Sequence, residues 1–364
     1  MKSQHYDYIF LGTGIISILE ACYQSKLGKS VLMIDKNPEV GGAWQPINIF
    51  GYNNVENAIH YFLEDTKAPD FMKNNLSWDI VEMTTKQRLL RVPLTNKHFK
   101  FKFNNIFGRF LSYLLNQNSY KNKNIFKAIF DVFKKVTTER NHTSYYIVGG
   151  APVMMETVKN LIRESSIYVQ TSTNIDSISI HKTEKRIELK SGSDYFHGNK
   201  LVFTHGSRLP NIISEQDIFV PNEKYHPRPA VHLLIEDHHK NNTDQWIFSN
   251  HKIIKYVHDL TNMVDKYNDT QGEKIFVFAL HPNIQKSEDI YSILHSELCK
   301  AGIVHKNSRL RDSYWTDVFL PTLYDEDLVS IEENFSPQMT FMKTENFAAG
   351  VGYYAKKWSK KIKV

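Results

Sequence analysis

Cysteine is scarce in this chain of 364 residues, which contains only Cys22 and Cys299. Two isolated thiols form no Cys-x-x-Cys pair and no zinc-finger spacing, so a disulfide framework and a structural zinc site are excluded. Cys22 falls inside the first expected helix, where a small buried thiol is the simplest interpretation. We therefore expect a reducing, cytoplasmic setting and no bound metal.

Long hydrophobic runs and charged blocks are also missing. No apolar stretch reaches the roughly 20 residues that a membrane-spanning helix needs, and residues 1–5 lead into a short strand-like run instead of a secretory signal. The formal net charge is only +6, and lysine and arginine look dispersed along the chain. We expect no integral membrane segment and no nucleic-acid partner, and a homodimer stays open.

The first clear motif is a glycine turn between a strand and a helix. Residues 8–11 are apolar, as in a strand buried on both faces, and are followed by Gly12-Thr13-Gly14-Ile15-Ile16-Ser17. The pattern then predicts a helix over 18–27 and a second buried strand over 30–34 that ends at Asp35. This order of strand, glycine turn, helix, strand and acid is typical of a dinucleotide-binding βαβ unit.

Each part of the βαβ unit has a physical role in binding a dinucleotide. Gly12 permits the tight turn, and Gly14 lets the backbone approach a pyrophosphate at the positive end of the helix. Asp35 can accept hydrogen bonds from both ribose hydroxyls and disfavours the 2′-phosphate of NADP. Ser17 replaces the third glycine and is small enough for close packing. The cofactor contacts expected here are Gly12, Gly14, Ile15, Ile16, Ser17, Asp35 and Lys36.

After Asp35 the chain continues to Gly41-Gly42-Ala43-Trp44. At this point the sequence resembles the superfamily of FAD-dependent amine oxidases, protoporphyrinogen oxidases and UDP-galactopyranose mutases, whose members continue from the acid to a Gly-Gly pair. The resemblance implies that FAD is the cofactor and that Gly41 and Gly42 lie along the pyrophosphate and flavin. Ala43 and Trp44, also expected beside FAD, depart from the Arg or Asn that the family often has.

Later segments extend the resemblance. Residues 146–163 are similar to a Gly-Gly start of a helix that returns the chain to the cofactor domain, and residues 167–178 to a stretch that contacts adenine. Residues 200–206 are similar to a strand with a Thr-x-Gly turn, and residues 344–352 to a ribityl-chain acid before the final helix. The cofactor contacts implied in these segments are Ile175, Thr204, Gly206, Glu345, Gly350 and Val351.

These returns to the cofactor predict an α/β fold with two domains. Residues 1–60, 145–210 and 330–364 are expected to form a discontinuous Rossmann-like FAD-binding domain with a parallel sheet. Residues 61–144 and 211–329 are expected to form an α+β substrate domain. Its strand candidates alternate polar and apolar residues, which favours a mostly antiparallel sheet.

Three side chains outside the cofactor motifs are candidates for chemistry. His60 falls where relatives bring a segment beside the flavin, and a histidine there could move protons or orient substrate, although a lone histidine is more often structural. Arg228 could bind a carboxylate or phosphate bidentately, unless it is a surface-loop arginine. Tyr314 could form a wall of the substrate pocket, with core packing as the alternative.

The leading hypothesis is an enzyme, an FAD-dependent oxidoreductase of the amine-oxidase-like type. It would transfer hydride from an amine or an alicyclic C–H substrate to N5 of the flavin, so the protein would supply position and electrostatics. The order of motifs also fits a redox-neutral, flavin-dependent sugar-nucleotide mutase of the UDP-galactopyranose mutase type. The departures at Ala43 and Trp44 leave open a diverged, non-catalytic FAD-binding protein.

Overall fold

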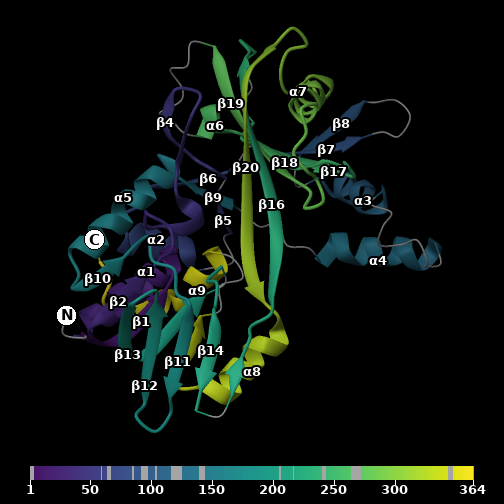
Figure 1. Cartoon of the computed structure of the whole chain (residues 1–364). Helices are drawn as coiled ribbons and strands as arrows, with labels where there is room; N and C mark the ends of the chain where they lie inside the picture. The colour runs from purple at the N-terminus through teal and green to yellow at the C-terminus, as the bar shows by residue number, and fades with distance from the viewer. Residues whose placement is uncertain are drawn as a thin grey trace.

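The computed structural model describes residues 4–58, 60–63, 67–83, 86–91, 97–102, 105–115, 125–138, 144–204, 206–215, 217–239, 243–263, 272–342 and 347–363 (Figure 1). Two large sheets organise these residues. Within them, no helix is long and apolar enough to span a bilayer.

The first sheet contains the predicted βαβ unit. Its described strands follow the order β10-β2-β1-β13-β12-β11-β14-β15, and β21 also pairs with β13. The strands β10, β2, β1, β13 and β21 run parallel, whereas β11 and β12 form an antiparallel hairpin beside β13. The bounds are β1 (His5–Leu11), β2 (Val31–Ile34), β10 (Ile167–Gln170), β11 (Ser177–His181), β12 (Arg186–Ser191), β13 (Asp194–Thr204), β14 (Asn211–Ser214), β15 (Ile218–Phe219) and β21 (Met339–Met342).

Both faces of the first sheet are buried, which explains why β2 and the second half of β1 are apolar. Phe10 belongs to the core on one face, whereas its neighbours Ile9 and Leu11 belong to the core on the other, as the alternation of a strand requires. Residues of α1 (Ile15–Lys26), α2 (Ala68–Asn75), α5 (Gly150–Arg163) and α9 (Phe347–Trp358) join the first core, and residues of α8 (Asp325–Phe335) join the second.

The second sheet follows the order β20-β16-β19-β18-β17-β7-β8 and is mostly antiparallel, with β17 and β7 parallel. Its strands are β7 (Lys86–Arg91), β8 (His98–Lys102), β16 (Glu223–Glu236), β17 (Gln245–Ser249), β18 (Ile254–Asp259), β19 (Glu273–Leu280) and β20 (Arg309–Leu323). Buried side chains of α7 (Ile290–Lys300) complete its core, and α3 (Ile106–Leu115), α4 (Ile125–Thr138) and α6 (Leu260–Met263) accompany it. The long pair β16 and β20 reaches from this sheet toward α8 (Figure 1).

Shorter elements lie between the sheets. They are β3 (Ile47–Ile49), β4 (Tyr52–Val55), β5 (Phe62–Leu63), β6 (Ile80–Glu82), β9 (Ser144–Ile147) and the 3-10 turn η1 (Gly42–Trp44).

Two segments lie on the other side of the expected domain boundaries. The first sheet continues past residue 210, because β14 pairs with β11 and β15 pairs with β14. Phe71, Met72 and Trp78 pack into the core beside α1, although residues 61–144 were assigned to the substrate side. In both cases contacts between segments distant in sequence decide the placement.

Candidate active site

The turn between β1 and α1 presents backbone to open space. Gly12 has φ +89° and donates its N–H to the Ile34 carbonyl at 2.8 Å, which fixes the turn against β2. Gly14 precedes α1, and a Cβ placed on it would meet no atom within 4 Å. No side chain caps the N-terminus of α1, and its first turn contains no acid. The first-turn N–H groups and the positive end of the helix are therefore available to an anion.

The Gly41-Gly42 pair packs directly against this turn. Gly41 forms a parallel bridge with Gly14 and donates its N–H to the Thr13 carbonyl at 2.9 Å. The φ angles of Gly41 and Gly42 are +117° and +60°, and a Cβ on Gly41 would lie 2.2 Å from the Met155 Cε atom. The left-handed backbone thus requires glycine at position 41, whereas the flexible end of Met155 could shift away from a Cβ. The two glycine segments of the sequence, Gly12–Gly14 and Gly41–Gly42, therefore lie side by side and form one surface of backbone.

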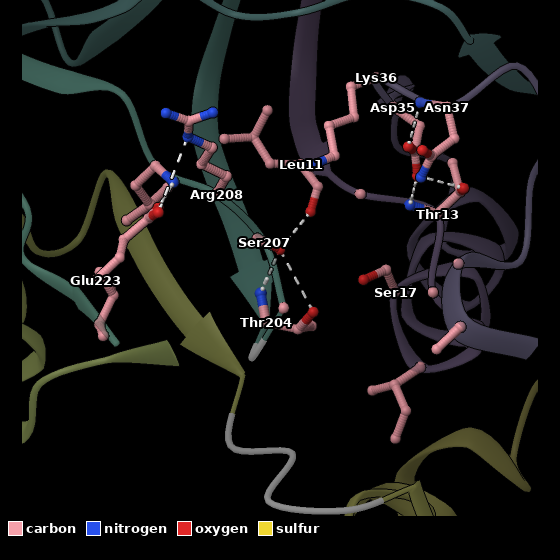
Figure 2. Close-up of a pocket in the computed structure, with 18 of the residues that line it drawn as sticks. Leu11, Thr13, Ser17, Asp35, Lys36, Asn37, Thr204, Ser207, Arg208 and Glu223 are labelled. Carbon is pink, nitrogen blue, oxygen red and sulfur yellow. Dashed lines mark hydrogen bonds and ion pairs between the residues drawn. The ribbon is translucent and has the colours of Figure 1, made fainter. Parts of the chain in front are cut away.

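Asp35 is buried at the end of β2 and holds the glycine turn (Figure 2). Its Oδ2 atom accepts hydrogen bonds from the Thr13 N–H at 2.7 Å and the Thr13 hydroxyl at 2.6 Å, and its Oδ1 atom accepts one from the Asn37 N–H at 2.9 Å. An ionised carboxylate offers about four lone-pair directions. One direction on Oδ1 is left for a ligand hydroxyl, which corresponds to one ribose contact in this conformation and not two.

A turn after β13 lies on the side of the Gly12 turn that is opposite to Asp35 (Figure 2). The Ser207 hydroxyl donates to the Leu11 carbonyl at 2.7 Å and accepts the Thr204 N–H at 3.1 Å (Figure 2). Gly206 has φ +89°, and a Cβ on it would meet no atom within 4 Å. The carboxyl ends of β1, β2 and β13 therefore open onto the same space, as is typical of ligand sites in parallel sheets.

These parts line one cavity of about 1540 Å³. The structure brings most of the residues selected from the sequence to it, namely Gly12, Gly14, Ile15, Ile16, Ser17, Asp35, Lys36, Gly41, Gly42, Ala43, Trp44, His60, Ile175, Thr204, Gly206 and Arg228. Sequence reasoning missed Thr13, Ser207 and Tyr256. Thr13 could have been noticed, because it stands between the two glycines; no local signal marked the others.

Among the described residues, two that were selected from the sequence do not line the cavity. Tyr314 does not line the cavity: it is 41% exposed on β20 and its ring meets that of His232 edge-on. Val351 is fully buried in the core. The substrate wall at Tyr314 and the flavin contact at Val351 stay predictions that the cavity lining does not support, because packing on β20 and α9 holds these two side chains away from it. Glu345 lies outside the described residues.

His60 stacks on Trp44 at the cavity wall, with ring centroids 3.7 Å apart and planes 24° from parallel. Burial lowers the pKa of His60 to about 3, so the imidazole is neutral at physiological pH. Its Nδ1 atom is buried and has no hydrogen-bond partner among the described residues. A neutral ring can donate one hydrogen bond and accept another.

Arg228 and Tyr256 lie at the cavity end formed by the second sheet. Burial raises the pKa of Tyr256 to about 12, with Tyr61 adding to the rise and Arg228 opposing it. Burial and the Arg228 charge lower the pKa of Lys255. A positive guanidinium beside a neutral phenol favours an anionic or neutral ligand group over a cation at this end.

A second cluster of titratable groups lies away from the cavity. Glu297 Oε2 is 3.3 Å from His251 Nε2 and 3.6 Å from His98 Nε2, an arrangement with metal-ligand chemistry. However, His251 Nδ1 accepts backbone N–H groups from Ile253 and Ile254 at 3.2 and 3.0 Å. The ring proton must then be on Nε2, where it donates to Glu297 and leaves no lone pair for a metal. Glu297 is therefore held by hydrogen bonds from His251 and Lys300.

The cavity fits the cofactor that the sequence implies. Gly14 and Gly206 leave room that side chains would fill, and the uncapped α1 N-terminus matches a pyrophosphate. Asp35 retains one acceptor direction for a ribose hydroxyl, and Ile175 lines the wall where the resemblance places adenine. The expected cofactor-binding residues that line the cavity therefore present suitable chemical groups to one continuous space.

Comparisons with known proteins agree with this geometry. The family of NAD(P)-binding Rossmann-like domains matches residues 11–74. An uncharacterised protein in the nifH2 5′ region of Methanosarcina barkeri is 29% identical over 94 residues, which are 26% of this chain and 49% of that protein. The match thus spans about half of that relative.

Solved structures share the fold over nearly the whole chain. Wild-type putrescine oxidase bound to putrescine has a TM-score of 0.67 at 11% identity and covers 98% of each chain. A candidate protoporphyrinogen oxidase from Exiguobacterium sp. 255-15 has a TM-score of 0.68 at 10% identity, covering 100% of this chain and 98% of that one. The expected fold is confirmed: the N-terminal part of the chain matches the NAD(P)-binding Rossmann-like domain, and the whole chain shares its fold with these two solved structures.

Proposed function

We propose that the chain binds FAD in this cavity and is an oxidoreductase that takes hydride from an amine or an alicyclic C–H substrate. The observation that carries the proposal is the continuity of the cavity, which joins the glycine turn and Asp35 to His60, Arg228 and Tyr256. Bound FAD would supply the redox chemistry, as hydride acceptance at flavin N5. A fold by itself does not fix a reaction, so the proposal rests on this site.

The chain's own residues would divide the work along the cavity. The first turn of α1 and the backbone of Gly14 and Gly42 would hold the pyrophosphate. Asp35 would accept one ribose hydroxyl while its other hydrogen bonds keep the glycine turn rigid. At the far end, Arg228 would attract a substrate carboxylate or phosphate. Its positive charge favours an amine that also carries an acidic group over a diamine, which is a cation.

An absorption spectrum of the purified protein tests the cofactor, and anaerobic addition of substrates tests the reaction. We expect a yellow protein whose flavin bleaches with an anionic amine or alicyclic substrate and responds more weakly to diamines. A colourless protein that does not bind added FAD would contradict the proposal. Activity on UDP-sugars only after dithionite reduction would instead favour the mutase, and bound FAD that neither donors nor dithionite reduce would favour a non-catalytic role.

His60→Phe is expected to lower kcat by about ten- to a hundredfold, a typical contribution of one positioned hydrogen-bonding side chain. Phenylalanine keeps the ring stack on Trp44 but removes the nitrogen atoms, so FAD binding should be unchanged. Because the pKa of His60 is about 3, the variant should lower rates equally at all pH values above 5. Stopped-flow measurement of flavin reduction against pH checks this; a lost titration step near neutral pH would contradict it.

A further inference from the structure

An apolar surface is exposed beside the second sheet. It is made by side chains of β8, α3 and α4, with exposed fractions of 59% for Phe99, 62% for Ile106, 62% for Phe107, 39% for Ile129, 67% for Phe130 and 57% for Phe133. We call these six residues the aromatic face. Soluble surfaces carry single exposed apolar residues, whereas a group of this kind marks an interaction site.

The aromatic face is built on elements that are anchored to the protein. The Arg88 guanidinium on β7 donates to the Ser112 hydroxyl on α3 at 3.1 Å, and the ring of Phe107 meets that of Phe101 on β8 edge-on at 6.3 Å. On α4, Val132 and Val136 are buried one turn apart. Figure 1 shows α3 and α4 on the outer side of the second sheet, with α4 projecting from the body. The exposed side chains therefore stand on fixed, convex elements.

The geometry of α4 makes its apolar side wider than its contact with the protein. At about 100° per residue, Ile129, Phe133 and Phe130 occupy neighbouring positions around the helix and continue the arc that Val132 and Val136 begin. The valines face inward, and the three larger side chains face outward. Packing within the chain thus uses only part of the hydrophobic side of α4.

Positive charge is concentrated in the same part of the chain. Residues 97–138 contain nine lysines and arginines and a single acid, Asp131, a net charge of +8 that exceeds the +6 of the whole chain. The remaining residues are thus slightly acidic together, and the expectation of dispersed positive charge is wrong for this segment. Lys102 on β8 and Lys134 on α4 are exposed.

We propose that the aromatic face, together with the exposed Lys102 on β8 and Lys134 on α4, docks the protein on an anionic lipid surface. A helix that exposes Phe and Ile beside lysines has the composition of segments that lie in the interfacial plane of a bilayer, with charge attracting them to acidic headgroups. A projecting helix with an exposed apolar side suits the surface of a bilayer, into which such side chains can insert. Docking of this kind places α4 in the membrane surface without spanning it.

Co-sedimentation of the full-length protein with lipid vesicles tests the proposal. The probes are vesicles of phosphatidylcholine alone and vesicles that also contain phosphatidylserine. We expect at least about tenfold tighter partitioning to the phosphatidylserine vesicles, decreasing as salt is raised, because screening weakens attraction between surface charges. Equal partitioning to both kinds of vesicle, or none to either, overturns the proposal.

Matched variants distinguish vesicle binding through the aromatic face from nonspecific adsorption of the protein. Phe130→Glu and Lys102→Glu should each weaken partitioning about tenfold or more, because one adds charge to the apolar side and the other removes attraction to the headgroups. Ile218→Glu is the control, since Ile218 is 65% exposed on β15 in the other sheet. Circular dichroism and FAD content should be unchanged in all three variants.

The outcomes are decisive in either direction. Loss in the two test variants with binding retained in Ile218→Glu supports membrane docking. Equal loss in all three, or no loss in any, overturns it. Binding of single-stranded nucleic acid in place of vesicles, or dimerisation that Phe130→Glu abolishes, would assign the aromatic face to a different partner and likewise overturn the proposal.

Discussion

Gly14→Val is expected to raise the FAD dissociation constant by at least about a hundredfold, equivalent to about 2.8 kcal/mol. The backbone at Gly14, with φ −61° and ψ 151°, suits valine, and a Cβ there meets no atom within 4 Å. The added methyl groups would instead fill the space where a pyrophosphate approaches the helix N-terminus. Titration of apoprotein with FAD, followed by flavin fluorescence, measures the change.

Gly28→Ala provides the matched control for folding. Gly28 follows α1, has φ +80° and does not line the cavity, so alanine there is strained and costs about 1 kcal/mol or more of stability. Valine in place of the Gly14 cap costs a similar amount. Both variants should therefore melt slightly earlier, but only Gly14→Val should lose FAD. Retention of FAD by Gly14→Val would show that the pyrophosphate does not pass this turn.

The second large effect concerns Glu56, a fully buried acid that follows β4. Its Oε1 atom accepts the Ala151 N–H in the first turn of α5 at 2.6 Å, and its carbonyl accepts a hydrogen bond from His232 Nε2 on β16 at 2.7 Å. The residue thus joins a helix beside the first sheet to a long strand of the second. Its Oε2 atom has no hydrogen-bond partner among the described residues.

We expect the wild-type protein to lose about 2 kcal/mol of unfolding free energy between pH 6.5 and pH 8 through Glu56. Burial raises the pKa of Glu56 to about 8, against hydrogen bonds from Ala151 and Tyr146 that lower it. The folded protein therefore keeps a proton that the unfolded chain has released, and stability falls as pH rises toward 8. Urea unfolding at the two pH values measures the slope.

The buried histidines also titrate partly in this window, with the opposite sign. Burial lowers the pKa of His60 and His258 to about 3 and that of His232 to about 4, so each adds about 0.4 kcal/mol of stability between pH 6.5 and pH 8 as the unfolded imidazole loses its remaining proton. The difference in slope between the wild type and a variant at Glu56 therefore isolates the contribution of this acid. Glu56→Gln, which keeps an acceptor for the Ala151 N–H, should show no loss from this position between pH 6.5 and pH 8.

Glu297→Gln is the comparison variant for the slope. The hydrogen bond from His251 is the largest cause that holds the pKa of Glu297 at about 2, so Glu297 is ionised at both pH values and its removal leaves the slope intact. A Glu56→Gln variant with the wild-type slope would show that Glu56 is ionised in the folded protein. Urea unfolding at the two pH values therefore shows whether Glu56 is protonated where it connects the two sheets.

The sequence predicted the parts of the site that depend on neighbouring residues. The turn at Gly12, the helix after Gly14 and the acid at Asp35 are encoded within one short segment, where glycine conformation and strand burial act locally. The Gly41-Gly42 pair follows closely enough to be assigned with them. The fold resemblance was likewise confirmed, because the order of motifs along the chain survives large changes in sequence.

What only the tertiary structure decided depends on segments that meet from distant parts of the chain. The paired Thr13–Asp35 hydrogen bonds leave one ligand direction on the acid, Tyr314 does not line the cavity, and burial between the two sheets raises the pKa of Glu56 to about 8. Burial and hydrogen bonding across the fold set each of these, and no local pattern encodes them. The aromatic face was not foreseen for the same reason. Its phenylalanine and isoleucine residues have the composition of a core, and only the packing of the fold shows that they are exposed.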